Sequence, residues 1–181
     1  MPTRRTVLLG AAGALLGTGP ATTRATGTTG SATFTLDRCE LRTPDRTDTA
    51  AVPQGFVFAP STARATPRGF PATRCTFTGT APAGAFRLAR PRVPSSDPTA
   101  RPMPAVRRSR LGPGIDAAEP YADVSAAHPW QQQRFAEYAD TGPGAAVPVP
   151  ANRPQPTAGE AAAHTGEVHL AGADGWRPWG R

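Results

Sequence analysis

The sequence predicts an all-β domain, a right-handed parallel β-helix with one short helix near its C-terminal end. Composition favours this fold, because 22 prolines and 19 glycines among 181 residues disfavour long helices. Proline removes a backbone donor and fixes φ. A repeat also favours it, since three segments share the pattern x-x-Arg-(Cys/Ser)-x-(Leu/Phe). Short strands that recur at a regular interval along the chain indicate a solenoid. The copies lie at 36–41, 72–77 and 106–111.

Each copy of the repeat marks one coil of the predicted β-helix. Side chains alternate along a strand, so Leu36 and Leu41 would point to opposite faces, and we expect each strand to bend or end within the repeat. Stacked coils would place Cys39, Cys75 and Ser109 in one inward ladder, about 4.8 Å apart. That spacing allows a disulfide between the cysteines, and a pair of buried free thiols is the alternative. Two cysteines without nearby histidines predict no metal site.

The other elements are short. Alternating or apolar runs bounded by proline and glycine predict strands at 55–62, 85–88 and 133–138. Proline clusters predict loops at 91–104 and 148–156. Thr157 and Glu160 form a capping-box signature ahead of three alanines, which predicts a helix from Ala158 to about His164 that ends near Gly166.

Residues 1–29 are interpreted as an export signal and linker. Arg4 and Arg5 precede an apolar run from Val7 to Leu16, which is too short for a bilayer that needs about 20 residues. A basic start and a short apolar run are typical of a secretory signal. The paired arginines favour the twin-arginine route, with an ordinary Sec signal as the alternative. We therefore expect a secreted, extracellular protein with no membrane span and a folded domain over 30–181.

The charge of the chain allows two interpretations. The formal net charge is +7, and every Lys or Arg position is arginine. A basic surface could bind a polyanion, either nucleic acid or an acidic polysaccharide. A general bias towards arginine codons explains the charge equally simply, and we favour it because the arginines are spread evenly along the chain. No nucleic-acid partner is expected.

Several motifs, in order along 30–181, resemble the C-terminal half of pectinesterases. Asp-Arg-Cys-Glu at 37–40 is similar to the segment that follows the central motif of that family, and Leu-Ala-Arg-Pro at 88–91 to its Leu-Gly-Arg-Pro-Trp motif. Arg-Phe-Ala-Glu-Tyr at 134–138, with Thr-Gly-Pro-Gly-Ala at 141–145, resembles the family's C-terminal signature. The resemblance implies a right-handed parallel β-helix without its N-terminal coils, and hydrolysis of the methyl esters of polygalacturonate in pectin breakdown.

The resemblance also implies a set of catalytic groups. The family uses one aspartate as nucleophile and a second as general acid and base, with glutamines that stabilise the oxyanion and an arginine that holds the nucleophile. Thr26 stands at the nucleophile position here, and the second aspartate and the glutamines would lie earlier, within the expected signal. Only Arg90 remains, and a guanidinium is no nucleophile. The aromatic residue expected two positions later is Arg92.

We therefore expect a pectinesterase-family chain with little or no esterase activity, and no cofactor. The candidate site residues are Arg90, as the family arginine, and Arg92 and Trp130, as contacts to the substrate. The alternative function is a non-catalytic module that binds pectin or another acidic polysaccharide. Glu137 belongs to a strand signature and is interpreted as structural. The open end of the β-helix is expected to expose strand edges and to favour aggregation.

Overall fold

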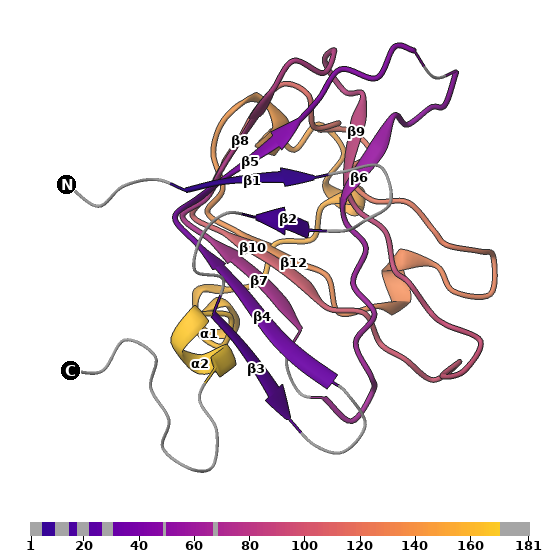
Figure 1. Cartoon of the computed structure of the whole chain (residues 1–181), viewed down its shortest axis with the longest axis vertical. Helices are drawn as coiled ribbons and strands as arrows, with labels where there is room; N and C mark the ends of the chain where they lie inside the picture. The colour runs from indigo at the N-terminus through magenta and orange to yellow at the C-terminus, as the bar shows by residue number, and fades with distance from the viewer. Residues whose placement is uncertain are drawn as a thin grey trace.

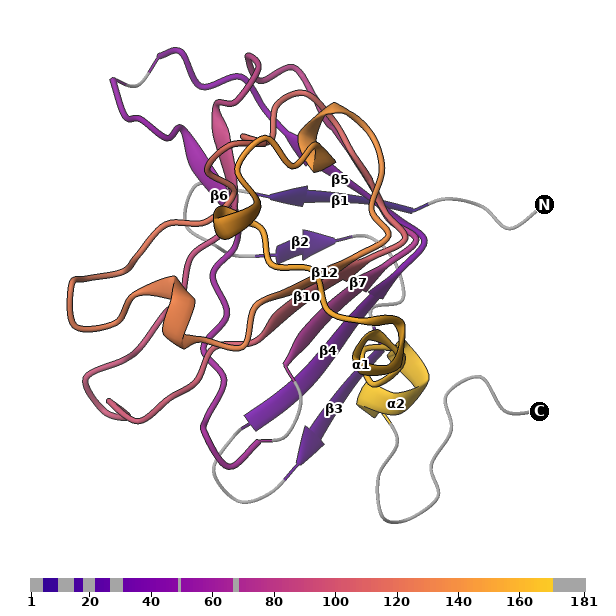
Figure 2. The same cartoon turned by 180° about the vertical axis from the view of Figure 1, so that it is seen from behind.

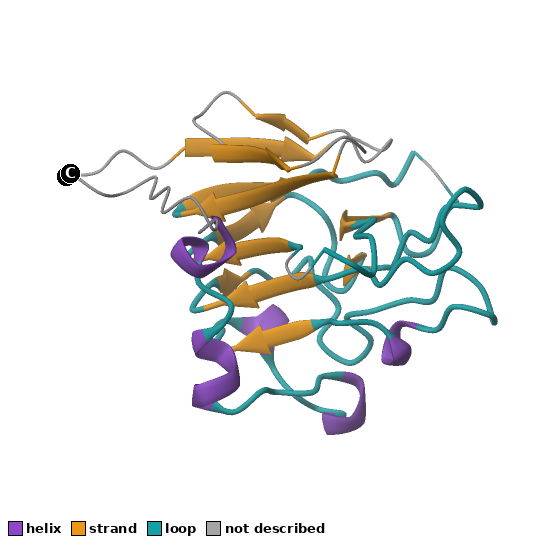
Figure 3. Cartoon of the chain, turned by 90° about the horizontal axis from the view of Figure 1, so that it is seen from below, coloured by secondary structure: helices purple, strands orange, loops and turns teal. Residues whose placement is uncertain are grey.

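The chain coils repeatedly, so that strands from successive coils stack side by side. The computed structural model describes residues 5–9, 15–17, 22–26, 31–48, 50–66 and 69–170. Seen from below, the strands form rungs one above another (Figure 3). Strands of successive coils pair in parallel. The predicted parallel β-helix is therefore confirmed.

Three sheets make up the walls (Figure 1). The first has the order β11 (Arg110–Leu111), β8 (Thr76–Gly79), β5 (Cys39–Thr43), β1 (Arg5–Leu9), β2 (Leu15–Gly17). The second has the order β12 (Ala136–Tyr138), β10 (Pro104–Arg107), β7 (Phe70–Thr73), β4 (Ser31–Asp37), β3 (Thr22–Thr26). The third pairs β6 (Gly55–Phe58) with β9 (Phe86–Ala89). The strands predicted at 55–62 and 133–138 are thus shorter than expected.

Part of the segment interpreted as an export signal lies on the first end of this stack. The backbone of β1 pairs in parallel with β5, and β2 pairs antiparallel with β1. On the second sheet, β3 pairs antiparallel with β4. These strands continue the two walls at the end where the sequence led us to expect an open edge. The export signal itself stays a prediction.

A single left-handed residue joins the second sheet to the first within each coil. These residues have φ values near +50° and are Arg38 (54°), Arg74 (55°), Arg108 (48°) and Ala139 (53°). Consecutive bends are tied together by backbone hydrogen bonds, because the N–H of Arg38 donates to the carbonyl of Thr73 at 2.9 Å, and the N–H of Arg74 donates to the next coil at 3.0 Å. The predicted bend within the repeat is therefore confirmed, and the structure adds a fourth copy at Ala139.

The bend turns both halves of each repeat towards the core. Leu36 and Leu41 lie on either side of Arg38 and are only 3% and 0% exposed. Leu41 stacks on Phe77, which stacks on Leu111, through the parallel register of the first sheet. Full burial of a side chain of this size stabilises the fold by about 1.5–3 kcal/mol. The core is therefore a set of apolar columns that run along the stack.

Proline is accommodated inside the second sheet. Pro71 lies in β7, between β4 and β10, and is fully buried. In a parallel sheet, successive N–H groups point to opposite neighbours. The N–H of Phe70 donates to the Met103 carbonyl beside β10 at 2.8 Å, so the absent N–H of Pro71 faces β4. Pairing with β4 begins one residue later, at Ala72. The missing N–H of Pro71 therefore lies just before the first residue of β7 that pairs with β4.

The C-terminal part adds short helices. The predicted helix is confirmed as α1 (Ala158–Ala162), with both hydrogen bonds of the Thr157–Glu160 capping box present. A second helix, α2 (Gly166–Leu170), begins where the first was expected to end, and it packs against β4 and β7 (Figures 1 and 2). Three 3₁₀ turns complete the fold: η1 (Trp130–Gln132), η2 (Pro143–Ala145) and η3 (Pro150–Asn152). Over the described residues, the helices lack the length and apolarity needed to cross a membrane.

The fourth bend gives a direct test of the backbone geometry. A non-glycine residue in the left-handed region is disfavoured by roughly 1–2 kcal/mol. Replacing Ala139 by glycine should therefore raise the free energy of unfolding by about 1 kcal/mol. The control is Ala136→Gly in β12, where glycine should lower it. Urea denaturation of both variants measures the difference, and a destabilised Ala139→Gly protein would contradict the assigned bend.

Candidate functional site

Arg90 follows β9 on the third sheet and is exposed. Its backbone N–H donates to the Phe58 carbonyl at 3.0 Å, which continues the pairing of β6 with β9. Its guanidinium carbon lies 4.8 Å from the centroid of the Phe56 ring, so a cation–π contact holds the side chain on the outer face. In the described part of the chain, no carboxylate forms an ion pair with Arg90. Asp37, the first acid of the resembling Asp-Arg-Cys-Glu motif, pairs with Arg38 and Arg74 instead.

The other two predicted contact residues lie in different settings. Arg92 is exposed, two residues beyond Arg90, and its N–H donates to the Pro60 carbonyl at 2.9 Å. Trp130 lies in η1 and is 8% exposed, because its ring packs 4.9 Å from the Tyr121 centroid and stacks on Phe135. Trp130 therefore offers little ring surface to a sugar in this conformation. A substrate contact by either residue stays a prediction.

A buried polar triad lies beneath Trp130. The Tyr121 hydroxyl donates to Glu137 Oε1 at 2.5 Å, and Arg153 Nε donates to the same oxygen at 2.9 Å. Glu137 and Arg153 are each 1% exposed. Burial, followed by the negative charge of Glu137, raises the pKa of the Tyr121 hydroxyl, so it remains a neutral donor. The triad has no exposed acid to offer a substrate, in agreement with the structural role expected for Glu137.

The acids nearest to the third sheet are already paired. Asp116 and Glu119 both accept hydrogen bonds from the guanidinium of Arg87, which lies in β9. Glu119 also lines a cavity of about 170 Å³ with Tyr121, Trp130 and Asn152. These contacts bind the third sheet to the loops that follow it. Both acids are thus engaged with Arg87, and neither forms an ion pair with Arg90.

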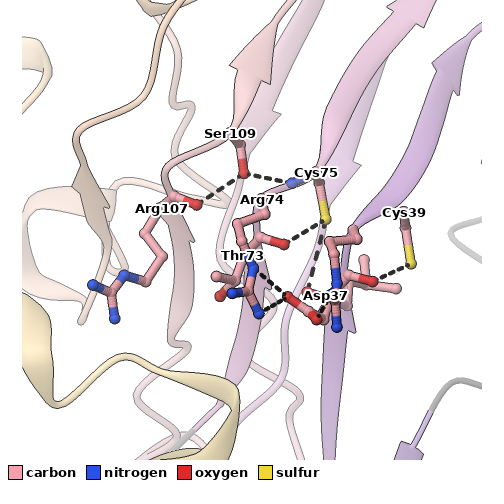
Figure 4. Close-up of polar contacts among 9 residues, drawn as sticks. Asp37, Cys39, Thr73, Arg74, Cys75, Arg107 and Ser109 are labelled. Atoms are coloured by element: carbon pink, nitrogen blue, oxygen red, sulfur yellow. Dashed lines mark hydrogen bonds and ion pairs between the residues drawn. The ribbon is translucent and has the colours of Figure 1, made fainter. Parts of the chain in front are cut away.

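The inward ladder expected from the repeat is present (Figure 4). Both cysteines are free thiols, which settles the alternative left open by the sequence. Cys75 Sγ lies 3.5 Å from the Thr73 carbonyl, and the backbone N–H of Cys75 donates to Ser109 Oγ at 3.1 Å. A hydrogen bond with the Cys39 side chain, and then burial, raise the pKa of the Cys75 thiol far above its usual value. A protonated thiol is a poor nucleophile, so this ladder has a structural role.

The fourth member of the ladder is Asp140, which the sequence pattern missed. Its Oδ1 accepts the N–H of Ser109 at 2.7 Å, and its Oδ2 is buried without a hydrogen-bond partner. Burial is the main reason that the pKa of Asp140 rises to about 7, with a further contribution from Glu137. Aligning the bend at Ala139 with the earlier copies would have located it. A carboxyl with a pKa near 7 could transfer a proton at neutral pH, but the free Oδ2 of Asp140 is buried.

Four arginines gather at the bends, on a different part of the molecule from Arg90. Arg38, Arg74, Arg107 and Arg108 line a cavity of about 410 Å³ together with Asp37, Thr73 and residues 165–167. Along the chain the arginines are spread evenly, as expected from the sequence. Their spacing equals the length of a coil, however, so stacking the coils brings them together. The recurrence of an arginine at the same position of each repeat copy was the signal that could have located the cluster.

The described residues contain no cluster of histidine, cysteine or carboxylate side chains suited to a metal ion. Guanidinium groups lie at the bends and at Arg90. Guanidinium groups bind and orient anions, and they neither attack an ester nor transfer a proton at neutral pH.

Comparisons with known proteins define the fold further. A scan of protein-family models finds no match, and a search of curated proteins finds none either. Among solved structures, a pectin methylesterase from Yersinia enterocolitica is similar at 24% identity and a TM-score of 0.63 over 75% of this chain. Pectin methylesterase PemA from Erwinia chrysanthemi is similar at 23% identity and a TM-score of 0.64 over 80% of this chain.

A further similar structure is a pectin methylesterase in complex with a hexasaccharide, at 21% identity and a TM-score of 0.63 over 80% of this chain. The chain spans 46% of the length of each of these three structures. Its fold is thus that of the pectin methylesterases, over less than half of their length. The resemblance stated from the sequence motifs is supported at this level.

The buried ion pair of the triad should be essential to stability. Replacing Arg153 by methionine leaves the Glu137 carboxylate buried without its partner, which should lower the free energy of unfolding by about 3–5 kcal/mol. The control, Arg110→Met, removes an exposed arginine and should change it by no more than about 0.5 kcal/mol. Chemical denaturation compares the two, and equal effects would contradict a structural role for the triad.

Asp140 should make stability depend on pH. Its folded pKa of about 7 lies above the ordinary value of 3.8, so the folded state holds the proton more tightly. The corresponding stabilisation is complete below about pH 4 and is lost as the pH rises towards 7. In Asp140→Asn, this fall in unfolding free energy should disappear. Denaturation at several pH values measures it, with Asp48→Asn as the exposed control, and a slope that persists in Asp140→Asn would refute the assignment.

Proposed function

We propose that this chain is a pectinesterase-family β-helix with little or no esterase activity of its own. The motifs that resemble the family and the pectin methylesterase fold support the family. The observation that supports inactivity is the setting of Arg90, which has no carboxylate partner in the described part of the chain. An ester carbonyl beside it would meet a cation and an aromatic ring, and no carboxylate among the described residues that pairs with that cation.

The assay for this proposal is methanol release from methyl-esterified pectin. The purified chain should release no more methanol than the heat-denatured chain, while an active pectin methylesterase serves as the positive control. Arg90→Gln should behave in the same way as the unchanged chain. Robust turnover by the unchanged chain that is lost in Arg90→Gln would overturn the proposal and establish Arg90 as a catalytic residue.

A second candidate function is binding of an acidic polysaccharide, and the arginines at the bends favour it. Export to the extracellular side would bring such a chain to cell-wall polymers, and one of the similar pectin methylesterases is solved with a hexasaccharide. Binding to polygalacturonate but not to DNA, at equal ionic strength, is the expected result. Equal and steeply salt-dependent binding to both polymers would show a general polyanion binder instead.

A further inference from the structure

The cavity at the bends is large enough for a ligand. Its volume of about 410 Å³ lies within the range of roughly 300–1,000 Å³ that is typical of ligand pockets. It lies where β4, β7 and β10 end, beside the start of α2, and in Figure 1 these bends are on the opposite side of the molecule from β6 and β9. The cavity is therefore separate from the face that carries Arg90.

The charges around the cavity do not balance. Its lining carries four guanidinium groups and two carboxylates, so four positive minus two negative charges leave an excess of two. Asp37 is already engaged, because it accepts from Arg38 Nε at 2.9 Å and from Arg74 Nη2 at 2.7 Å. Within the described chain, neither Arg107 nor Arg108 has an ion-pair partner. The excess positive charge is thus concentrated on these two residues.

Arg107 is the most telling member of the cluster. It is only 7% exposed, and its Nε has no hydrogen-bond partner. The guanidinium extends away from Asp37 and Arg74 (Figure 4) and lies 5.9 Å from the Tyr138 ring centroid. Burial lowers the pKa of Arg107, and the neighbouring positive charge of Arg108 lowers it further. A buried charged donor without a partner is destabilising, and a bound anion would supply the missing partner.

The arrangement of the cations indicates the kind of anion. A guanidinium presents a planar pair of donors that matches a carboxylate. The bends at Arg38, Arg74 and Arg108 place one arginine in each of three coils. With coils about 4.8 Å apart, this spacing suits a polymer with one carboxylate on each unit. The described lining has no aromatic ring on which a nucleic-acid base could stack. These features favour a uronic-acid chain over a nucleic acid.

We propose that this cavity binds carboxylate groups of an acidic polysaccharide through Arg107 and Arg108. The inference rests on the second candidate function and assigns its site. Arg107 would receive the buried carboxylate, while Arg108 and Arg74 would face the neighbouring units. Because methyl esterification removes the charge that the guanidinium groups recognise, the site would select de-esterified chains.

The test is calorimetric titration of the full chain with a galacturonate trimer at low, fixed ionic strength. The fully methyl-esterified trimer is the uncharged probe, and a short DNA oligomer is the competing polyanion. Arg107→Met and Arg108→Gln should each weaken binding of the acidic trimer about tenfold, since each removes a charge-assisted hydrogen bond. Arg110→Gln is the matched control, because it removes one exposed arginine from the same coil, outside the cavity. It should leave binding unchanged.

The outcomes separate the site from the function. If the unchanged chain does not bind the trimer, both the site and the polysaccharide-binding function fail. If it binds, but Arg108→Gln and Arg110→Gln weaken binding equally, the function stands and the assigned site is wrong. Preferential binding of DNA, or equal binding of the methyl-esterified trimer, would also overturn the site. Thermal melts monitor folding, and Arg108→Gln, which changes an exposed side chain, decides the matter if Arg107→Met does not fold.

Discussion

The left-handed residue at each bend is the constraint on which the rest of the structure depends. It turns the chain so that apolar residues five positions apart, such as Leu36 and Leu41, both reach the interior. The same turn places the next residue in the inward ladder, where Cys75 and Ser109 are hydrogen-bonded. It also leaves the bend residue itself, as at Arg108, on the outside. Core, ladder and arginine cluster are therefore three results of one repeated backbone conformation. In a residue other than glycine, this left-handed conformation is disfavoured by roughly 1–2 kcal/mol.

The coils, the inward ladder and the capped helix could be predicted from the sequence, whereas the fourth coil and the arginine cluster were not. The x-x-Arg-(Cys/Ser) pattern located three coils, and the capping box of Thr157 located α1. The fourth coil was missed because Ala139 takes the left-handed place without an arginine or a following cysteine, and Asp140 was missed with it. The arginine cluster was missed because the arginines were considered by their distribution along the chain, although the repeat places one of them in each of three coils.

Three arginines show how setting decides what the same side chain can do. Arg153 is buried and neutralised by Glu137, so it serves the fold. Arg90 is exposed over the Phe56 ring, the place that the family resemblance gives to a catalytic arginine. Arg107 is buried and forms no ion pair among the described residues, which is an arrangement suited to an anion from outside. The family resemblance makes Arg90 the candidate catalytic arginine. Burial without an ion pair makes Arg107 the candidate anion-binding arginine.

The accessibility of the Cys75 thiol in the inward ladder depends on whether the neighbouring coils are stacked or separated. Cys75 is closed off by the coil on either side, and its sulfur contacts backbone carbonyls of Leu36 and Thr73. Alkylating reagents act on the ionised, accessible form of a thiol, which Cys75 reaches only when neighbouring coils separate. The rate at which this sulfur is modified therefore measures how often the stack parts at that rung, without any label or mutation being introduced.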